Sequence, residues 1–304
     1  MTHSLEVQIS SLRLRNPVIT ASGTFGYGLE YSQFIDLNLA GAITVKGLSL
    51  NPKQGNPPPR IYETPCGMIN SIGLQNIGID AFVVEKLPFL KKFDTKIIVN
   101  FFGENLDEYV EMALKLDATD GIHALEMNVS CPNKSSEWRK MGLEAELLKK
   151  AVKEVRAVTF KPLIVKLSPQ VTDITVMAKI CEDEGADAVS LINTIPAMVI
   201  DIKSRKSIIG TTTGGLSGPA IRPVAVRMVF EVSRAVKIPV IGMGGIVTAD
   251  DALQFLIAGA RAIAIGTANF INPHATLKVV EGIKKFLFEE RITDINDLIG
   301  SFRD

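Results

Sequence analysis

Polar side chains stand at the end of nearly every short apolar run in this sequence. They are Ser22, Lys46, Asn100, Asn128, Lys166, Asn193 and Thr194. If the runs are strands of one parallel barrel, their carboxyl ends meet on one rim, where barrel enzymes carry their active sites. Strand ends are also polar simply because loops begin there. Amides and amines on most of the rim nevertheless favour a functional site.

Glycine-rich turns indicate a second kind of chemistry. The sequence contains GGLSG at 214–218, GMGG at 242–245 and AIGTA at 264–268. Backbone N–H groups exposed after strands, next to the start of a helix, bind phosphate groups. Glycine is common in any tight turn, but the last two motifs follow the last two expected strands. Their joint position predicts a phosphorylated ligand.

Cys131, in NVSCPN, directly follows the fourth expected strand. A buried thiol is most often an inert small apolar group, but at a strand end on the active face it could act as a base or nucleophile. The usual base is missing from the rim, because the histidines are the near-terminal His3, His274 near a helix start, and His123 before its strand. Lys46 and Lys166 could instead form a Schiff base, as in barrel aldolases, or neutralise an anion.

The composition excludes several classes of protein. The chain has 304 residues, 46% hydrophobic and 22% charged, and its 33 basic and 33 acidic residues give zero net charge. This balance excludes a mainly disordered chain and argues against nucleic-acid binding. Three cysteines without a C-x-x-C motif exclude a disulfide framework, a zinc ribbon and a local four-cysteine iron–sulfur site. Cys181 is expected in a helix core, and Cys66 has no assigned role.

Eight apolar runs rich in Val, Ile and Leu predict strands buried on both faces, as in a parallel sheet. They span 17–23, 41–47, 96–103, 124–132, 162–169, 188–194, 239–245 and 262–268. Amphipathic segments between them predict helices over 106–116, 144–158, 172–184, 219–236 and 249–258. Thr172 and Thr248 are expected as N-caps, and Gly185 and Gly259 as C-terminal stops.

This alternation predicts an α/β fold, a (β/α)8 TIM barrel formed by one domain over 1–304. A doubly wound open sheet is the alternative, but it usually carries G-x-G-x-x-G after its first strand, and none is present there. Residues 5–14 are expected to form a hairpin that closes the barrel bottom. Long insertions after strands 2 and 6 are expected on the active-site face. The start has no signal-peptide core and no apolar run reaches membrane-spanning length, so a cytoplasmic protein is expected.

The whole chain resembles the dihydroorotate dehydrogenases, flavin enzymes of pyrimidine synthesis. The resemblance is densest in the following segments: ITASGTFGYGLEY, TVKG, RIYETPCGMINSIGLQN, MNVSCPN, VKLSP, LINT, GGLSGP, GMGG and AIGTA. ASGTFGYGLEY and GMINSIGLQN are similar to family 1, subclass B. Those are catalytic subunits that hold FMN and work with a second subunit carrying FAD and a 2Fe–2S cluster.

The resemblance implies a set of FMN-binding residues in this single domain. They are Ser22, Lys46, Gly47, Asn100, Asn128, Lys166, Ile192, Gly218, Gly244, Gly245, Gly266 and Thr267. The glycines and Thr267 would hold the phosphate. Lys166 would place positive charge near the pyrimidine end of the flavin ring and favour the anionic reduced flavin.

The resemblance also implies a site for dihydroorotate and orotate. Its residues would be Lys46, Asn70, Ser71, Ile72, Gly73, Leu74, Asn128, Asn133, Asn193 and Thr194. Amides suit the substrate ring because they both donate and accept hydrogen bonds. Cys131 would remove the C5 proton while hydride leaves C6 for flavin N5. The loop after Cys131 departs from the subclass, since 134–141 contains no glycine.

Oxidation of (S)-dihydroorotate to orotate is therefore the expected activity. Electrons would pass from FMN to NAD⁺ through the FAD and 2Fe–2S subunit, in a heterotetramer of two catalytic and two partner chains. The nearest alternative is the fumarate-linked homodimer of subclass A. A Schiff-base aldolase using Lys166 and a catalytically silent partner-binding subunit are more distant alternatives.

Overall fold

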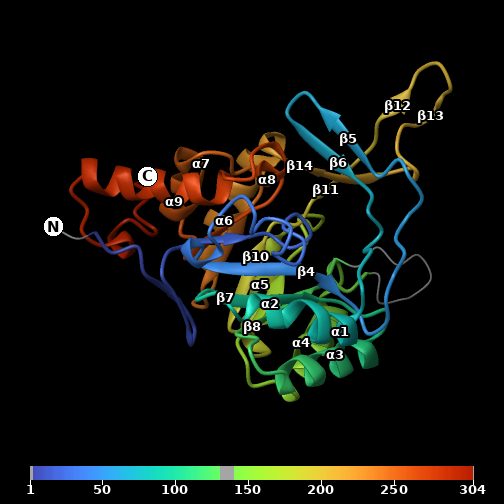
Figure 1. Ribbon diagram of the computed structural model, residues 1–304, viewed down its shortest axis with the longest axis horizontal. Helices are drawn as coiled ribbons and strands as arrows, with labels where there is room; N and C mark the ends of the chain where they lie inside the picture. The colour runs from blue at the N-terminus through green and yellow to red at the C-terminus, as the bar shows by residue number, and fades with distance from the viewer. Residues whose placement is uncertain (1–2, 131–139, 304) are drawn as a thin grey trace.

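A closed barrel of eight parallel strands forms the centre of the computed structural model, which describes residues 3–130 and 140–303 (Figure 1). Around the barrel the strands are β10 (Ala188–Leu191), β15 (Val240–Met243), β16 (Ala262–Ile265), β3 (Val18–Thr20), β4 (Ala42–Leu48), β7 (Lys96–Phe101), β8 (Ala124–Asn128) and β9 (Leu163–Lys166). The predicted TIM barrel is confirmed, and the open doubly wound sheet is wrong.

The barrel strands are buried on both faces, which explains their near-continuous apolar sequences. Every residue of β9, β10, β15 and β16 is buried. Inward side chains fill the barrel and outward side chains meet the surrounding helices. The strands are shorter than the apolar runs predicted, because the last residues of several runs already belong to loops on the rim.

Helices cover the outside of the barrel, each with an apolar stripe against the strands. They include α3 (Leu106–Ala118), α4 (Ala145–Ala157), α5 (Ile174–Asp183), α6 (Arg222–Ala235), α7 (Ala249–Ile257) and α9 (Ala275–Glu289). The four-residue helix α8 (Ala268–Ile271) instead follows β16 and lines a cavity at the carboxyl ends of the strands. The short helices α1 (Ile79–Ala81) and α2 (Leu87–Leu90) follow β4 and its insertion. In the part of the chain that the structure describes, no helix is both long and apolar enough to cross a membrane.

The helix ends follow the predictions with two corrections. Thr248 caps α7 in a capping box with Asp251, as predicted. Thr172 is not the cap of α5, because Asp173 directly precedes the helix and its carboxylate accepts from the backbone N–H of Thr175. The helix predicted to begin at 219 starts as a 3-10 turn, and α6 begins at Arg222, since Pro223 has no N–H to continue an α-helical ladder backwards.

The N-terminal segment forms the predicted hairpin, from β1 (Val7–Ile9) and β2 (Leu12–Leu14). Its tip contacts the amino end of β10, where the hydroxyl of Ser10 donates to the Asp187 carboxylate at 2.8 Å. The same carboxylate accepts from Arg156 at 2.7 Å and from the N–H of Leu163 at 2.8 Å. The hairpin therefore closes the end of the barrel opposite the predicted rim.

The two long insertions pair with each other, which the sequence did not indicate. One contributes β5 (Ile61–Thr64) and β6 (Gly67–Asn70), and the other contributes β11 (Ile195–Ala197) and β14 (Gly214–Ser217). Their antiparallel sheet has the order β11-β14-β6-β5 and lies to one side of the barrel (Figure 1).

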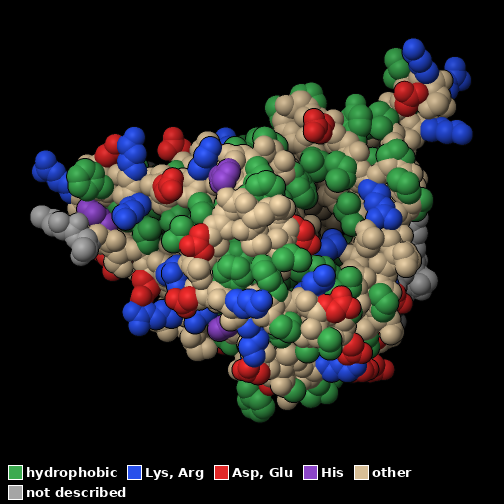
Figure 2. Space-filling view, in the orientation of Figure 1, with side chains coloured by type: hydrophobic (Ala, Val, Ile, Leu, Met, Phe, Trp, Pro, Cys, Tyr) green, Lys and Arg blue, Asp and Glu red, His purple; other side chains and the backbone are tan. Residues whose placement is uncertain are grey.

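A small hairpin projects beyond that sheet, built from β12 (Ile200–Asp201) and β13 (Lys206–Ser207) (Figure 1). Basic side chains gather at its end in the space-filling view (Figure 2), and Lys203, Arg205 and Lys206 are exposed.

Candidate active site

A cavity of about 1910 Å³ opens where the carboxyl ends of the barrel strands meet the insertion sheet. Its lining includes every predicted site residue that the structure describes. These are Ser22, Lys46, Gly47, the 70–74 loop, Asn100, Asn128, Lys166, Ile192, Asn193, Thr194, Gly218, Gly244, Gly245, Gly266 and Thr267. Cys131 and Asn133 lie outside the described residues. A pocket for one small molecule usually encloses no more than about 1,000 Å³, so this cavity has room for two ligands side by side.

Two lysines line the cavity from different strands of the barrel, β4 and β9. Lys166 ends β9, is only 6% exposed, and donates to the hydroxyl of Ser22 at 3.4 Å. Lys46 lies on β4, where burial, and then the nearby charge of Arg60, lower its pKa below the ordinary lysine value. An anionic ligand beside Lys46 would offset both effects, because an opposite charge favours the ammonium form.

Two asparagines form a linked pair at the ends of β8 and β10. The side-chain oxygen of Asn128 accepts from the N–H of Ser130 at 3.1 Å and from the amide of Asn193 at 3.3 Å. The Asn193 oxygen accepts from the N–H of Thr194 at 2.8 Å. The backbone carbonyl of Asn128 is held by the Tyr109 hydroxyl at 2.7 Å. Since its oxygen is already used, Asn128 offers its N–H₂ group to a ligand.

The strand register places site residues of neighbouring strands at the same height along the barrel axis. Asn128 is paired with Lys166 between β8 and β9. Asn100 on β7 lies beside Gly47, where an added Cβ would come within 2.6 Å of the Asn100 side-chain oxygen. Glycine at 47 therefore makes room for this amide, as no other residue can.

Glycines form a narrow cradle at the ends of β14, β15 and β16. Gly218, Gly244 and Gly245 have φ values of +93°, +129° and +76°, which favour glycine. A Cβ on Gly245 would lie 2.6 Å from the carbonyl oxygen of Gly218, so these two turns are packed against each other. The hydroxyl of Thr267 donates to that of Ser217 at 2.7 Å and ties the third strand end to them. Such a cluster of backbone turns suits a phosphate group.

The 70–74 loop is held over the cavity by the insertion sheet. Asn70 pairs with Gly215 in the β6–β14 register, and its side chain donates to the Gly215 carbonyl at 3.2 Å. Ser71 accepts from Asn56 at 2.8 Å and from Thr211 at 2.7 Å. The loop is therefore fixed by contacts to both insertions.

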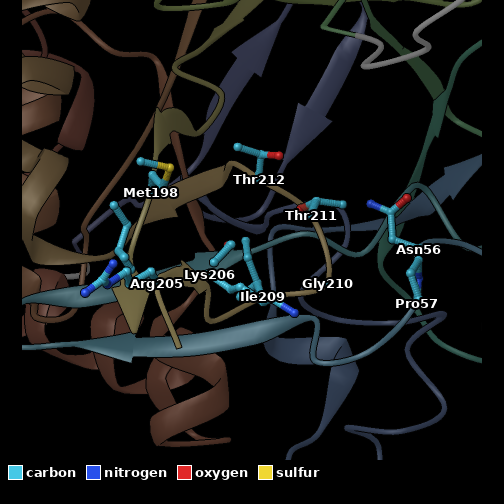
Figure 3. A pocket seen from close by; sticks show the side chains of 11 residues that line it. Asn56, Pro57, Met198, Arg205, Lys206, Ile209, Gly210, Thr211 and Thr212 are labelled. Carbon is cyan, nitrogen blue, oxygen red and sulfur yellow. The ribbon is translucent and has the colours of Figure 1, made fainter. Parts of the chain in front are cut away.

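A second cavity of about 720 Å³ lies by the projecting hairpin, outside this site. Figure 3 shows Asn56 and Pro57 on one side of it and Met198, Arg205 and Lys206 on the other. None of the sequence-predicted site residues lines it.

The remaining candidates have simple structural explanations. Cys181 is fully buried in α5, and burial raises the pKa of its thiol, which confirms it as a core residue. His123 accepts from the N–H of Ile97 at 3.1 Å, at the end of the barrel away from the cavity, and burial lowers its pKa. Cys66 is exposed and lines the cavity mouth. Among the described residues, no group of three or more His, Cys, Asp or Glu side chains is placed to hold a metal.

One residue of the site region was missed by sequence reasoning. Glu126 is a carboxylate inside an apolar strand, only 2% exposed, and it accepts a hydrogen bond from Asn100 at 2.6 Å. The available signal was an acidic residue in the middle of the run ALEMN. It lies directly below the cavity lining rather than in it.

A parallel barrel with amides, lysines and glycine turns around a cavity on its carboxyl rim is the arrangement of an enzyme of the TIM-barrel class. The chain belongs to the dihydroorotate dehydrogenase family, which matches residues 4–287. Members of this family are flavin-dependent enzymes.

Named relatives cover nearly the whole chain. A protein of Thermodesulfovibrio yellowstonii called dihydroorotate dehydrogenase B (NAD(+)), catalytic subunit is 77% identical over 300 residues, 99% of each chain. Proteins of the same name from Thermoanaerobacter pseudethanolicus and Trichlorobacter lovleyi are 57% identical over 300 residues and 55% identical over 301 residues, again 99% of each chain.

Gly245→Ala is expected to damage the cradle and release bound flavin. The new Cβ would meet the Gly218 carbonyl. The positive φ of this position also costs a non-glycine residue about 1–2 kcal/mol. Gly300→Ala is the matched control, because its φ is +72° but its Cβ would meet nothing closer than 4.0 Å. Both variants should lower thermal stability, whereas only Gly245→Ala should lose flavin absorbance on purification. Equal flavin content in the two variants would contradict the cradle.

Proposed function

We propose that this chain oxidises (S)-dihydroorotate to orotate in pyrimidine biosynthesis, as the FMN-holding subunit of a two-component enzyme. The observation that carries the proposal is the meeting of all the described predicted site residues around one cavity, in a chain of the dihydroorotate dehydrogenase family. The cavity offers hydrogen-bonding amides, two lysines and a glycine cradle, which suit a phosphorylated flavin beside a flat anionic pyrimidine.

The residues present fit FMN. The turns at Gly218, Gly244 and Gly245 pack too closely against neighbouring protein atoms to admit a Cβ, and they line the cavity together with Gly266 and Thr267. Their backbone N–H groups would hold the phosphate. Ser22, Asn100, Lys166 and Ile192 would contact the ring system and ribityl chain deeper in the cavity. When bound, the flavin supplies the acceptor for a hydride. The protein supplies position, charge and the base.

Lys46 and the linked amides would bind the substrate. The Lys46 ammonium would face the carboxylate together with the 70–74 loop. Asn128 offers N–H₂, because its oxygen is already occupied, and Asn193, Asn133 and Thr194 would complete the contacts to the ring. These groups hold the C5–H bond toward the base, so the proton leaves in a fixed direction.

Cys131 is proposed as the base that takes the C5 proton. The support from the described residues is that Ser130, the residue before it, lines the cavity. A thiol titrates closer to neutrality than a hydroxyl, so more of it is present at working pH as the thiolate, which takes the C5 proton and becomes a thiol. A base of this kind also suits a reducing compartment, and we propose the cytoplasm.

The electron acceptor is proposed to be NAD⁺, reached through a partner subunit with FAD and a 2Fe–2S cluster. The support is the name shared by the relatives, which contains both NAD(+) and "catalytic subunit". Two such chains with two partners would form a heterotetramer.

The decisive experiment purifies this chain alone and identifies its chromophore after denaturation. We expect FMN, reduction of that FMN by dihydroorotate, and little turnover with either NAD⁺ or fumarate until the partner is added. Recovery of FAD or of no flavin from folded protein would refute the assignment. Efficient fumarate use would instead move the chain to the fumarate-linked subclass A.

Cys131→Ser should keep FMN but slow its reduction by dihydroorotate by about a hundredfold or more, because general-base catalysis typically contributes that much. Stopped-flow absorbance measures the rate, which in the unmodified enzyme should rise with pH through the thiol pKa. Cys66→Ser is the control, since Cys66 also lines the cavity but is given no role in the proposed reaction. A loss of rate in Cys66→Ser rather than in Cys131→Ser would reverse the assignment.

Orotate binding should take up protons at alkaline pH. The lowered pKa of Lys46 means that the free site loses this charge below the pH at which an ordinary lysine does. Bound carboxylate restores the charge, so affinity falls as pH rises through the lowered pKa. Calorimetry in two buffers of different ionisation enthalpy measures the uptake. Lys46→Met should abolish it and weaken binding about tenfold or more, as expected for a lost charged hydrogen bond. Unchanged proton uptake in Lys46→Met would show that Lys46 is not the group that gains the proton.

A further inference from the structure

A carboxylate lies buried inside the barrel, one layer below the cavity. Glu126 is on β8, is 2% exposed, and is absent from the cavity lining. Burying a carboxylate is costly unless its oxygens are hydrogen-bonded. The hydrogen-bond partners of Glu126 must therefore offset the cost of burying it in the middle of an apolar strand.

Neutral donors, rather than a cation, satisfy Glu126. The amide nitrogen of Asn100 donates to one carboxylate oxygen at 2.6 Å, and the hydroxyl of Ser190 donates to the other at 2.8 Å. The nearby Lys166 instead donates to Ser22. The carboxylate thus joins β7, β8 and β10 across the interior.

The consequence concerns the orientation of the Asn100 amide. The N–H₂ end of Asn100 faces Glu126, because the Glu126 carboxyl oxygen accepts the hydrogen bond from it. The oxygen of Asn100 then points the other way and lies against Gly47, on the cavity lining. Asn100 therefore offers the cavity a hydrogen-bond acceptor, although asparagine in general can offer either group.

We propose that Glu126 is a positioning residue that fixes the Asn100 amide so that the pocket recognises an N–H group of the bound flavin. The inference rests on the proposed function. The oxidised isoalloxazine ring has a single N–H, between two carbonyls. An acceptor at Asn100 matches that N–H, whereas the reversed amide would place donor against donor. Glu126 would thus determine ligand recognition without touching the ligand.

The first experiment measures FMN binding to the deflavinated full chain by fluorescence quenching. Glu126→Met should weaken FMN binding about tenfold, because one oriented hydrogen bond is lost. Ser190→Ala is the matched control, since it removes the other partner of the same carboxylate and should change binding by less than about threefold. Glu126→Met should have no further effect in an Asn100→Ala background, because residues that act as a unit are not additive.

The second experiment reverses the polarity of the pair with isosteric substitutions. Asn100→Asp alone places two carboxyl groups together and should weaken FMN binding about tenfold. Adding Glu126→Gln supplies an N–H₂ that donates to one oxygen of the carboxylate introduced on β7 and leaves the other oxygen as an acceptor facing the cavity. The double variant should therefore recover binding to within about threefold of the unmodified chain. A residue that only supports the fold would not produce this recovery.

The outcomes separate the two proposals. If the unmodified deflavinated chain does not bind FMN, the proposed function fails. If it binds FMN but Glu126→Met binds equally well, or the double variant is no better than Asn100→Asp, only the role of Glu126 is overturned. Should Glu126→Met not fold, as judged by its thermal transition, the isosteric pair decides the question alone.

Discussion

The common direction of the eight barrel strands is the constraint on which the rest of the structure depends. Closure of the parallel ladder requires every strand to run the same way, so all carboxyl ends meet at one rim. Residues as distant in sequence as Ser22 and Lys166 come within 3.4 Å for this reason. The register then sets the finer placement and puts Asn128 beside Lys166. The 70–74 loop depends in addition on a second long-range contact, the pairing of β6 with β14 in the insertion sheet.

Features that depend on local sequence could be predicted. The strands were recognisable because residues buried on both faces must be apolar, and glycine stops such as Gly185 and Gly259 take the positive φ that their turns need. The errors were also local in origin. Thr172 and Asp173 are both capping residues, and only the geometry of the first turn shows that Asp173 accepts the hydrogen bond. The start of α6 depends on the missing N–H of Pro223.

Features that depend on contacts between distant segments could not be predicted in the same way. The rim residues were identified, but the pairing of β6 with β14 joins two insertions whose sequences give no sign of each other. The orientation of Asn100 depends on Glu126 and on its hydrogen bond, which no spacing reveals. The resemblance to a known family identified which residues are expected around the cavity. Only the three-dimensional arrangement shows which end of each amide a ligand meets.

The insertion sheet also constrains the order in which the molecule is assembled during synthesis. Strand β6 ends at Asn70, but its partner β14 begins only at Gly214, so much of the chain must leave the ribosome before the two can pair. Until then β5 and β6 form a two-stranded hairpin, which is marginally stable by itself. The early barrel units therefore emerge with an unpaired strand edge, and the roof of the cavity is completed late in synthesis. Such non-local pairing slows folding and leaves that edge open to wrong partners in the meantime.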